Sequence, residues 1–322
     1  MRGILIVNTG SPRTKAREDV KFFIGAMLSD PLVMSVPDFI RKTLATKIIA
    51  PFRASRSAAN YSLIWDNERD QSPLLYNTRM LAQKIQESTG MRVEIAMRYG
   101  IPSITDALNR LKDKNGTLRE VVVVPLFPQY AQSSYQTVVD EVEKCFSEAP
   151  YPFKIKTLEP YYKEYGYIHA LAESIKPHII DGYDRLVFSF HSLPLSHVDA
   201  GWKKGKEFDY VYQIKETIRL VSKELNIDPQ KNRIVYSSAI GKKWLEPDLN
   251  KTMLELPRNG VKKIVIITPG FPADNLETLY DIDIVARENF MKGGGEKFTY
   301  VPCLNFEQYW IDGLIRIITS VV

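Results

Sequence analysis

The chain has few cysteines and histidines for its length. Its 322 residues include two cysteines, Cys145 and Cys303, and four histidines. Two thiols cannot complete a four-cysteine zinc or iron–sulfur site, and they do not provide a disulfide-stabilised framework. These absences exclude a cysteine-built cofactor site within this sequence.

Long apolar runs and targeting segments are missing as well. No stretch of 18 or more apolar residues occurs, so no transmembrane helix is expected. The N-terminal sequence MRGILIVNTG contains an apolar run that is too short for the core of a signal peptide and is typical of a first β-strand. We therefore predict a cytoplasmic protein.

The sequence also lacks the loops that bind phosphate groups. It contains no G-x-G-x-x-G, no G-x-x-x-x-G-K-[ST] and no G-x-S-x-G pattern, which argues against dinucleotide-binding, NTP-binding and α/β-hydrolase sites. The net charge is only +5, and few aromatic residues lie among the basic ones. Nucleic acid is therefore not expected as a partner.

The sequence does contain short β-branched runs that alternate with helical patterns, which predicts parallel sheets joined by crossover helices. Strands are expected at residues 4–8, 93–98, 121–125, 153–158, 186–190, 233–237, 264–268 and 298–301. The chain is longer than one ordinary hydrophobic core requires. We predict an α/β fold of two facing Rossmann-like (flavodoxin-like) domains, residues 1–160 and 161–322, each with a four-stranded parallel sheet flanked by helices.

A weak internal repeat supports two copies of one plan. VVVVPLFPQY and VIITPGFPAD share a strand followed by Pro-x-Phe-Pro, and ILIVNTGSP is similar to LVFSFHSLP. Superposing these segments places Thr9 opposite His191 and Ser133 opposite Glu277. The first half would then contribute hydroxyl groups, and the second an imidazole and carboxylates, to one cleft.

Two segments of the second half carry groups suited to metal or proton chemistry. His191 ends an apolar strand, and ligands bind at the carboxyl ends of strands in open α/β sheets. A helix beginning at Asp274 would place Asp274, Glu277, Asp281 and Glu288 within roughly 60° of arc. The alternatives are a solvated helix face for the acidic stripe and a packed or surface residue for the histidine.

A basic segment lies between residues 41 and 56, where no acidic residue occurs. It contains five basic residues, which are interleaved with apolar ones. The basic residues are Arg41, Lys42, Lys47, Arg53 and Arg56. This pattern suits a ligand with an apolar body and carboxylates at its edge, or a membrane surface. An amphipathic helix with a cationic solvent face is the alternative.

Seven segments together resemble ferrochelatases. In order they are ILIVNTGSP, SPLLYNT, MRYGIPSI, PLFPQYAQSS, SFHSLP, GKKWLEP and PGFPADNLETLYDIDI, and they span the chain from Ile4 to about Ile318. The combination of SFHSLP with DNLETLYDID is the specific one. The resemblance implies a chelatase-like fold and a lyase that inserts Fe²⁺ into a porphyrin in haem biosynthesis, with loss of two pyrrole protons.

The resemblance also implies roles for particular residues. His191 and Glu277 match the family's catalytic residues, and the metal would contact His191, Glu277 and Asp281. The family's acidic helix is locally widened, which would align Glu277 with Asp281. Thr9 matches a residue close to the macrocycle face. Iron would be a substrate and not a permanently bound cofactor, and without a cysteine-rich tail no iron–sulfur cluster is expected.

The chemistry of a porphyrin suggests the remaining substrate-binding candidates. Its apolar body needs aromatic walls, and the candidates for these are Phe127, Tyr130, Trp244 and Phe271. Core packing is the alternative explanation for each of them. Its propionates need cations or hydroxyl groups as partners. The candidates for these are Arg53, Arg56, Ser72 and Ser133.

Several alternatives remain open from the sequence. The substrate is protoporphyrin IX or coproporphyrin III, and the expected partners are porphyrin and ferrous iron, with the protein acting as a monomer. Peripheral membrane contact is the alternative use of the basic segment. Competing functions are a chelatase for another tetrapyrrole or metal, a tetrapyrrole carrier that inserts no metal, and a flavodoxin-like redox module.

Overall fold

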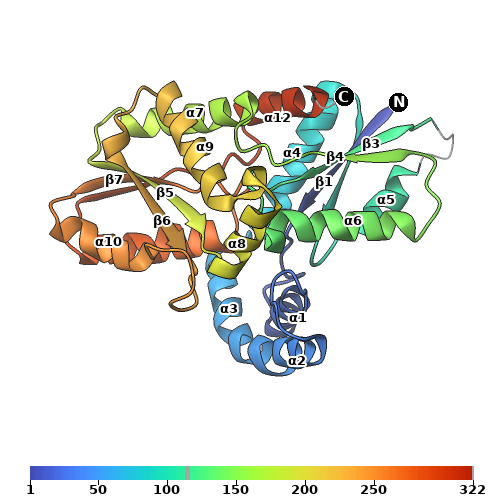
Figure 1. Ribbon diagram of the computed structural model, residues 1–322, viewed down its shortest axis with the longest axis horizontal. Helices are drawn as coiled ribbons and strands as arrows, with labels where there is room; N and C mark the ends of the chain where they lie inside the picture. Colours follow the sequence, from blue (N-terminus) through green and yellow to red (C-terminus); the bar gives the residue numbers. More distant parts are fainter. Residues whose placement is uncertain (113–116, 321–322) are drawn as a thin grey trace. The chain divides into compact units, whose positions relative to one another are not determined.

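The computed structural model describes residues 1–112 and 117–320, which divide into two compact units, each built on one parallel sheet (Figure 1). Unit 1 comprises residues 1–127, residues 132–159 and the described end of the chain from residue 318. Unit 2 comprises residues 128–131 and 160–317.

The sheet of unit 1 has the order β2-β1-β3-β4, with every neighbouring pair parallel. Its strands are β1 (Arg2–Asn8), β2 (Arg92–Met97), β3 (Glu120–Pro125) and β4 (Lys154–Thr157). Its helices are α1 (Arg17–Leu28), α2 (Asp38–Thr43), η1 (Leu44–Ile49), α3 (Ala50–Ile64), α4 (Pro73–Thr89), α5 (Ile104–Leu111), η2 (Gln132–Gln136) and α6 (Thr137–Ser147).

The sheet of unit 2 has the equivalent order β6-β5-β7-β8, again parallel throughout. Its strands are β5 (Arg185–His191), β6 (Asn232–Ser237), β7 (Lys263–Ile267) and β8 (Lys297–Tyr300). Its helices are α7 (Tyr165–Ile179), α8 (Leu195–Lys204), η3 (Lys206–Phe208), α9 (Tyr210–Glu224), η4 (Pro229–Lys231), α10 (Leu249–Arg258), η5 (Glu277–Ala286), α11 (Arg287–Lys292) and α12 (Gln308–Ser320), whose last turn passes into unit 1.

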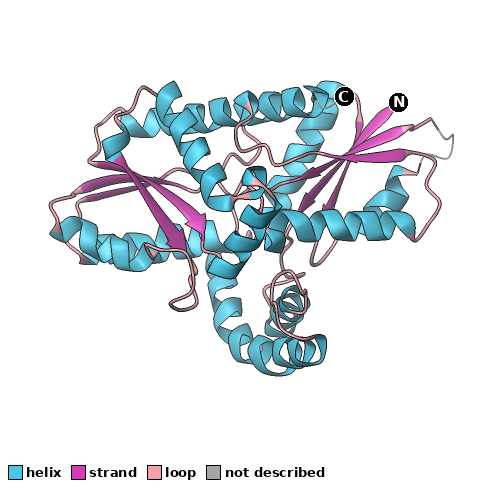
Figure 2. Ribbon diagram, viewed as in Figure 1, coloured by secondary structure: helices cyan, strands magenta, loops and turns pink. Residues whose placement is uncertain are grey.

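The predicted fold class is confirmed within each unit: a four-stranded parallel sheet flanked by helices (Figure 2). The eight strands lie where the β-branched runs placed them, with ends that differ by one or two residues. The repeat extends to rare elements. A π-helix follows β3 as η2, and another follows β7 as η5, so Ser133 and Glu277 occupy equivalent elements of the two units.

Burial explains why the strands of unit 2 are apolar on both faces. In Figure 1, α7 and α9 cover one face of its sheet and α10 covers the other. On the α10 side, η5 and α11 insert Ile282, Ala286 and Phe290 into a core that also contains strand residues such as Val187 and Ile266. This packing fixes the inner face of η5 and so determines which of its residues point away from the core.

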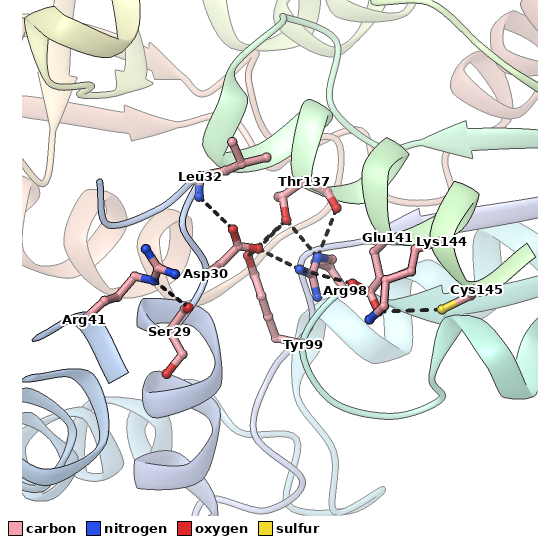
Figure 3. Close-up of polar contacts among 10 residues, drawn as sticks. All are labelled: Ser29, Asp30, Leu32, Arg41, Arg98, Tyr99, Thr137, Glu141, Lys144 and Cys145. Atoms are coloured by element: carbon pink, nitrogen blue, oxygen red, sulfur yellow. Dashed lines mark hydrogen bonds and ion pairs between the residues drawn. The ribbon is translucent and has the colours of Figure 1, made fainter. Parts of the chain in front are cut away.

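A buried polar cluster in unit 1 holds the segment after α1 against the end of β2 (Figure 3). Asp30 is 5% exposed, and its Oδ2 accepts hydrogen bonds from Arg98 Nη2 at 2.7 Å, Tyr99 Oη at 2.8 Å and Thr137 Oγ1 at 2.5 Å. Its Oδ1 accepts the backbone N–H of Leu32 at 2.8 Å. The buried charge of Asp30 is thus paired and fully hydrogen-bonded, as buried carboxylates require.

Candidate active site

His191 and Glu277 lie at the topological switch point of the unit 2 sheet. The chain passes from β5 to β6 on one side and returns to β7 on the other, so the carboxyl ends of β5 and β7 lie at the position where open α/β sheets bind their ligands. His191 is the last residue of β5, and Glu277 is the first residue of η5, which follows β7. Two segments 86 residues apart in the sequence therefore meet at one point.

The two side chains are directly hydrogen-bonded, with 2.8 Å between His191 Nδ1 and Glu277 Oε2. Because a carboxylate can only accept, a neutral His191 donates from Nδ1 and keeps the lone pair on Nε2. The His191 side chain is 42% exposed, whereas that of Glu277 is 14% exposed. The pair therefore presents an accessible imidazole supported by a largely enclosed carboxylate.

The electrostatics of the pair favour an ionised Glu277 and a basic His191. Burial alone would lower the pKa of His191, but the charge and hydrogen bond of Glu277, with the charge of Asp281, raise it above its usual value. Burial would likewise raise the pKa of Glu277, but His191 and hydrogen bonds from Ser237 and Ser238 lower it. Such a pair can take up a proton at the imidazole and stabilise the resulting charge.

Three residues that the sequence analysis did not identify hold this pair in place. The Ser237 hydroxyl contacts Glu277 Oε1, and Tyr210 donates its hydroxyl hydrogen to the backbone carbonyl of His191 at 3.0 Å. Ser238 adopts a left-handed φ of 60°, which is uncommon for a residue with a side chain and typical of functional sites. The only sequence signal for these serines is their position at the end of a β-rich run, and in the structure Ser237 pairs with His191 in the sheet register.

The acidic helix is widened, as the family resemblance implies: η5 is a π-helix over its ten residues, and not the regular helix on which the spacing of the acidic stripe was based. Its wider turn, with bonds between residues five apart, brings Glu277 and Asp281 closer to one face than a regular helix does. Asp274 does not belong to the predicted stripe. It lies before the helix, is buried, and accepts hydrogen bonds from Tyr300 Oη at 2.6 Å and Asn305 Nδ2 at 2.7 Å. Glu288 lies in α11 and is exposed.

The predicted metal contacts His191, Glu277 and Asp281 all belong to this region, and His191 and Glu277 are directly hydrogen-bonded. In the described part of the chain, no three histidine, cysteine, aspartate or glutamate side chains gather closely enough to hold a metal ion. Asp281 acts on His191 through its charge.

The aromatic candidates of unit 2 differ in accessibility. Trp244 is half-buried and pairs with Pro194 across an isolated β-bridge, and Phe271 is also half-buried. Tyr130 is 3% exposed, packs edge-on against Phe208, and accepts a hydrogen bond from Lys204 Nζ at 2.7 Å. Trp244 and Phe271 therefore keep accessible surface for a ligand, while Tyr130 forms part of the surrounding packing.

In unit 1, Thr9 and Ser133 are half-buried, whereas Phe127 and Ser72 are buried. Ser72 is the N-cap of α4: its Oγ accepts the backbone N–H of Leu75 at 3.2 Å and lies 2.5 Å from Ser11 Oγ. The Ser72 hydroxyl thus has a structural use that its sequence context did not indicate. Substrate binding by these four residues stays a prediction.

The basic segment forms α2, η1 and α3, and most of it is exposed as expected. Arg53 and Arg56 are exposed beside Phe52, which is 89% exposed. Arg41 does not contribute to this cationic face. It is 4% exposed, donates to the backbone carbonyls of Ser29 and Val36, and pairs with Asp38.

Comparison with known proteins identifies the family of this chain. The family model described as ferrochelatase matches residues 1–321. Ferrochelatases from Pseudomonas putida and Francisella tularensis subsp. holarctica are each 36% identical to it, over 96% and 98% of this chain and 96% and 95% of theirs. The chain belongs to the ferrochelatase family. It is therefore an enzyme, a lyase that inserts metal into a porphyrin in haem biosynthesis and acts on porphyrin and ferrous iron.

Solved structures support the chelatase fold. SirB from Bacillus subtilis, solved with Fe³⁺, gives a TM-score of 0.59 at 11% identity over 99% of this ferrochelatase-family chain and 95% of its own. CbiX, the terminal enzyme of sirohaem biosynthesis in denitrifying bacteria, gives 0.51 at 12% identity over the full length of both. At such identities the likeness concerns the fold alone. Among the described residues, no helix is both long and apolar enough to span a bilayer.

Proposed function

We propose that His191 and Glu277 form the catalytic centre for insertion of ferrous iron into protoporphyrin IX or coproporphyrin III. The observation that carries this proposal is the 2.8 Å contact between Nδ1 and Oε2 at the switch point, with the imidazole accessible. The pair also favours an enzyme over a tetrapyrrole carrier, because a carrier needs an axial ligand but no proton acceptor supported by a carboxylate.

The proton chemistry follows from the hydrogen bond. His191 Nε2 accepts a proton from a pyrrole N–H, and the imidazolium that forms is stabilised by Glu277 at Nδ1. Release of this proton to solvent restores neutral His191 for the second pyrrole proton. The two lost protons balance the charge of one Fe²⁺ entering the macrocycle.

The same groups fit the metal substrate. Imidazole and carboxylate are suitable ligands for Fe²⁺, although they bind zinc and copper at least as well. Asp281 lies one turn behind Glu277 on η5, and we assign it to the approach of the cation. Selection of iron then depends partly on which metal is supplied.

The setting of the reaction is part of the proposal. We propose that the protein works as a cytoplasmic monomer without a resident metal or iron–sulfur cluster, with Trp244 and Phe271 of unit 2 beside the macrocycle. The cationic face of α3 has two candidate uses, binding of propionates by Arg53 and Arg56 or contact with an anionic membrane surface. The exposure of Phe52 beside these arginines favours an amphipathic ligand of either kind.

Anaerobic incubation with ferrous iron and each porphyrin, followed by absorbance, tests the function. We expect metalloporphyrin to form with at least one of the two substrates at a rate proportional to enzyme concentration. Porphyrin binding without metallation would instead identify a carrier. A bound yellow chromophore in the purified protein would point to the redox module.

A further inference from the structure

A loop of unit 2 carries two consecutive lysines. It lies at the carboxyl end of the strands, where His191 also lies. The loop of residues 238–248 leaves the end of β6, where Ser237 is paired with His191 in the sheet register. Its return is fixed by hydrogen bonds from Leu195 N to Lys243 O at 2.9 Å and from Leu245 N to Leu193 O at 3.0 Å. The backbone of this loop is therefore tied to the residues that directly follow His191.

The charge of this loop is not neutralised within the protein. Lys242 and Lys243 are both exposed, and within residues 1–112 and 117–320 neither ammonium group forms an ion pair or a hydrogen bond. Glu246, the acidic residue closest in sequence, is exposed and forms no ion pair with them. In contrast, Lys204 of α8 is bonded to Tyr130. Two exposed lysines, consecutive in the sequence and without an ion-pair partner in the described residues, are available to bind an anion.

An apolar surface lies beside these cations. Ile240, at the tip of the same loop, is 59% exposed, and Trp244 at its base is half-buried. A ligand for this loop therefore combines an apolar body with a carboxylate at its edge. A porphyrin has this chemistry, and the anchoring of the loop to the His191 segment places the cations at the same end of the sheet as the proposed catalytic pair.

We propose that Lys242 and Lys243 bind a carboxylate of the porphyrin, so that unit 2 supplies both the catalytic pair and a substrate-orienting cationic rim. This inference rests on the proposed function and adds a specificity-determining site to it. Because the rim acts on the carboxylates and not on the pyrrole nitrogens, it contributes to the Michaelis constant and not to the chemical step. A porphyrin with four carboxylates gains more from it than one with two.

The double variant Lys242→Gln/Lys243→Gln tests the rim. At low ionic strength we expect the Michaelis constant for coproporphyrin III to rise about 3- to 10-fold, in line with two exposed ion pairs, with kcat changed less than about twofold. The effect should be smaller for protoporphyrin IX and should fade as salt screens the charges. Lys215→Gln/Lys223→Gln, which removes the same charge from exposed positions on α9, is the matched control and should leave both constants unchanged.

Three further outcomes are informative. If the wild-type protein metallates neither porphyrin, the proposed function fails, and fluorescence titration with metal-free porphyrin then tests the rim on its own. If the wild type is active and the double variant keeps its Michaelis constants and porphyrin affinity, the rim proposal is overturned. The same unchanged constants, together with weaker sedimentation of the variant with phosphatidylglycerol vesicles, would assign the loop to a membrane surface instead.

Discussion

At the scale of single residues, the active-site chemistry depends on one hydrogen bond that gives two ionisable groups different tasks. Glu277 is enclosed and held in its charged form by His191, Ser237 and Ser238. His191 is accessible and made more basic by that charge. In the proposed mechanism, the carboxylate therefore supports the imidazole, and the imidazole exchanges protons with the substrate.

Replacing His191 with alanine should reduce metallation by about 10²- to 10⁴-fold, because the proton acceptor is lost. Porphyrin affinity should stay nearly unchanged, since the imidazole contributes little of the binding surface. Single-turnover absorbance and fluorescence titration measure the two properties. His178→Ala, on α7, is the control. Wild-type turnover of the His191 variant would remove this residue from the mechanism.

Glu277→Gln keeps the shape of the side chain but cannot stabilise an imidazolium or accept a proton. We expect kcat to fall at least about 100-fold, with a smaller change in the Michaelis constant for porphyrin. Glu288→Gln alters an exposed glutamate that follows on α11 and should be close to wild type. An equal fall of kcat in the two variants would mean that catalysis depends on the negative charge of this part of the chain and not on the contact between Glu277 and His191.

At the scale of elements, η5 shows how one helix serves both the core and the site. Its inner residues Ile282 and Ala286 pack into the core of unit 2, and Glu277 at its start meets His191. A π-helix has a wider turn than a regular helix, with bonds between residues five apart, and such helices are rare, so a stretch of ten residues depends on its packing. The buried face provides this packing through apolar burial.

The cationic face of α3 gives the first prediction at this scale. Charge reversal in Arg53→Glu/Arg56→Glu should raise the Michaelis constant for porphyrin about 3- to 10-fold if these arginines bind propionates. Steady-state kinetics at low salt measure this, with Lys215→Glu/Lys223→Glu as the control for net charge. An unchanged constant with weaker vesicle sedimentation would assign the face to a membrane.

The junction of β5 and β7 gives a second prediction at this scale. Asp184, just before β5, accepts the backbone N–H groups of Lys262 and Lys263 at 2.7 and 2.8 Å, and these bonds lower its pKa below the usual 3.8. Asp184→Asn should weaken the local stability by about 0.5–1.5 kcal/mol, measured as faster amide exchange in β7.

The pH dependence of this effect has a definite sign. Because the carboxyl group has a lower pKa in the folded protein, its stabilisation is fully present above about pH 4 and is lost as the pH falls through the folded value. The difference between wild type and Asp184→Asn should therefore shrink toward pH 3. A difference that does not change with pH would show that the charge of Asp184 is not involved.

At the scale of the whole molecule, the two units repeat one topology but carry different chemistry. Both sheets have the same strand order, and both have a π-helix after the third strand. In unit 1 that helix contains Ser133, whereas in unit 2 it begins with Glu277. The shared fold provides equivalent positions, and in the proposed mechanism the residues at those positions assign proton transfer to unit 2.

If iron is a substrate and not a resident cofactor, the stability of the whole molecule should not depend on bound metal. Treatment with a strong chelator, followed by its removal, should change the thermal midpoint by less than about 1 °C, since a metal that does not hold the fold adds little to its stability. Activity should return fully when ferrous iron is added, and zinc should also be inserted. A fall of several degrees on chelation would reveal a structural metal or cluster.

Much of the fold could be predicted because local patterns determine it. The β-branched runs predicted the eight strands of the described residues, and the sequence already placed His191 at the carboxyl end of a strand, where ligands bind in such sheets. Asp274 shows where such patterns fail. Its spacing suggested the acidic stripe, but Tyr300 and Asn305, which lie far along the chain, hold it in the core.

The sequence by itself determined the two-unit parallel architecture and named His191 and Glu277, because strand periodicity and short motifs are local properties. Only the tertiary structure decided that these two side chains share a hydrogen bond, that Ser237 and Ser238 hold Glu277 charged, and that Arg41 and Ser72 serve the fold. These contacts join segments up to 86 residues apart. Their energies depend on burial and geometry that exist only once the chain has packed.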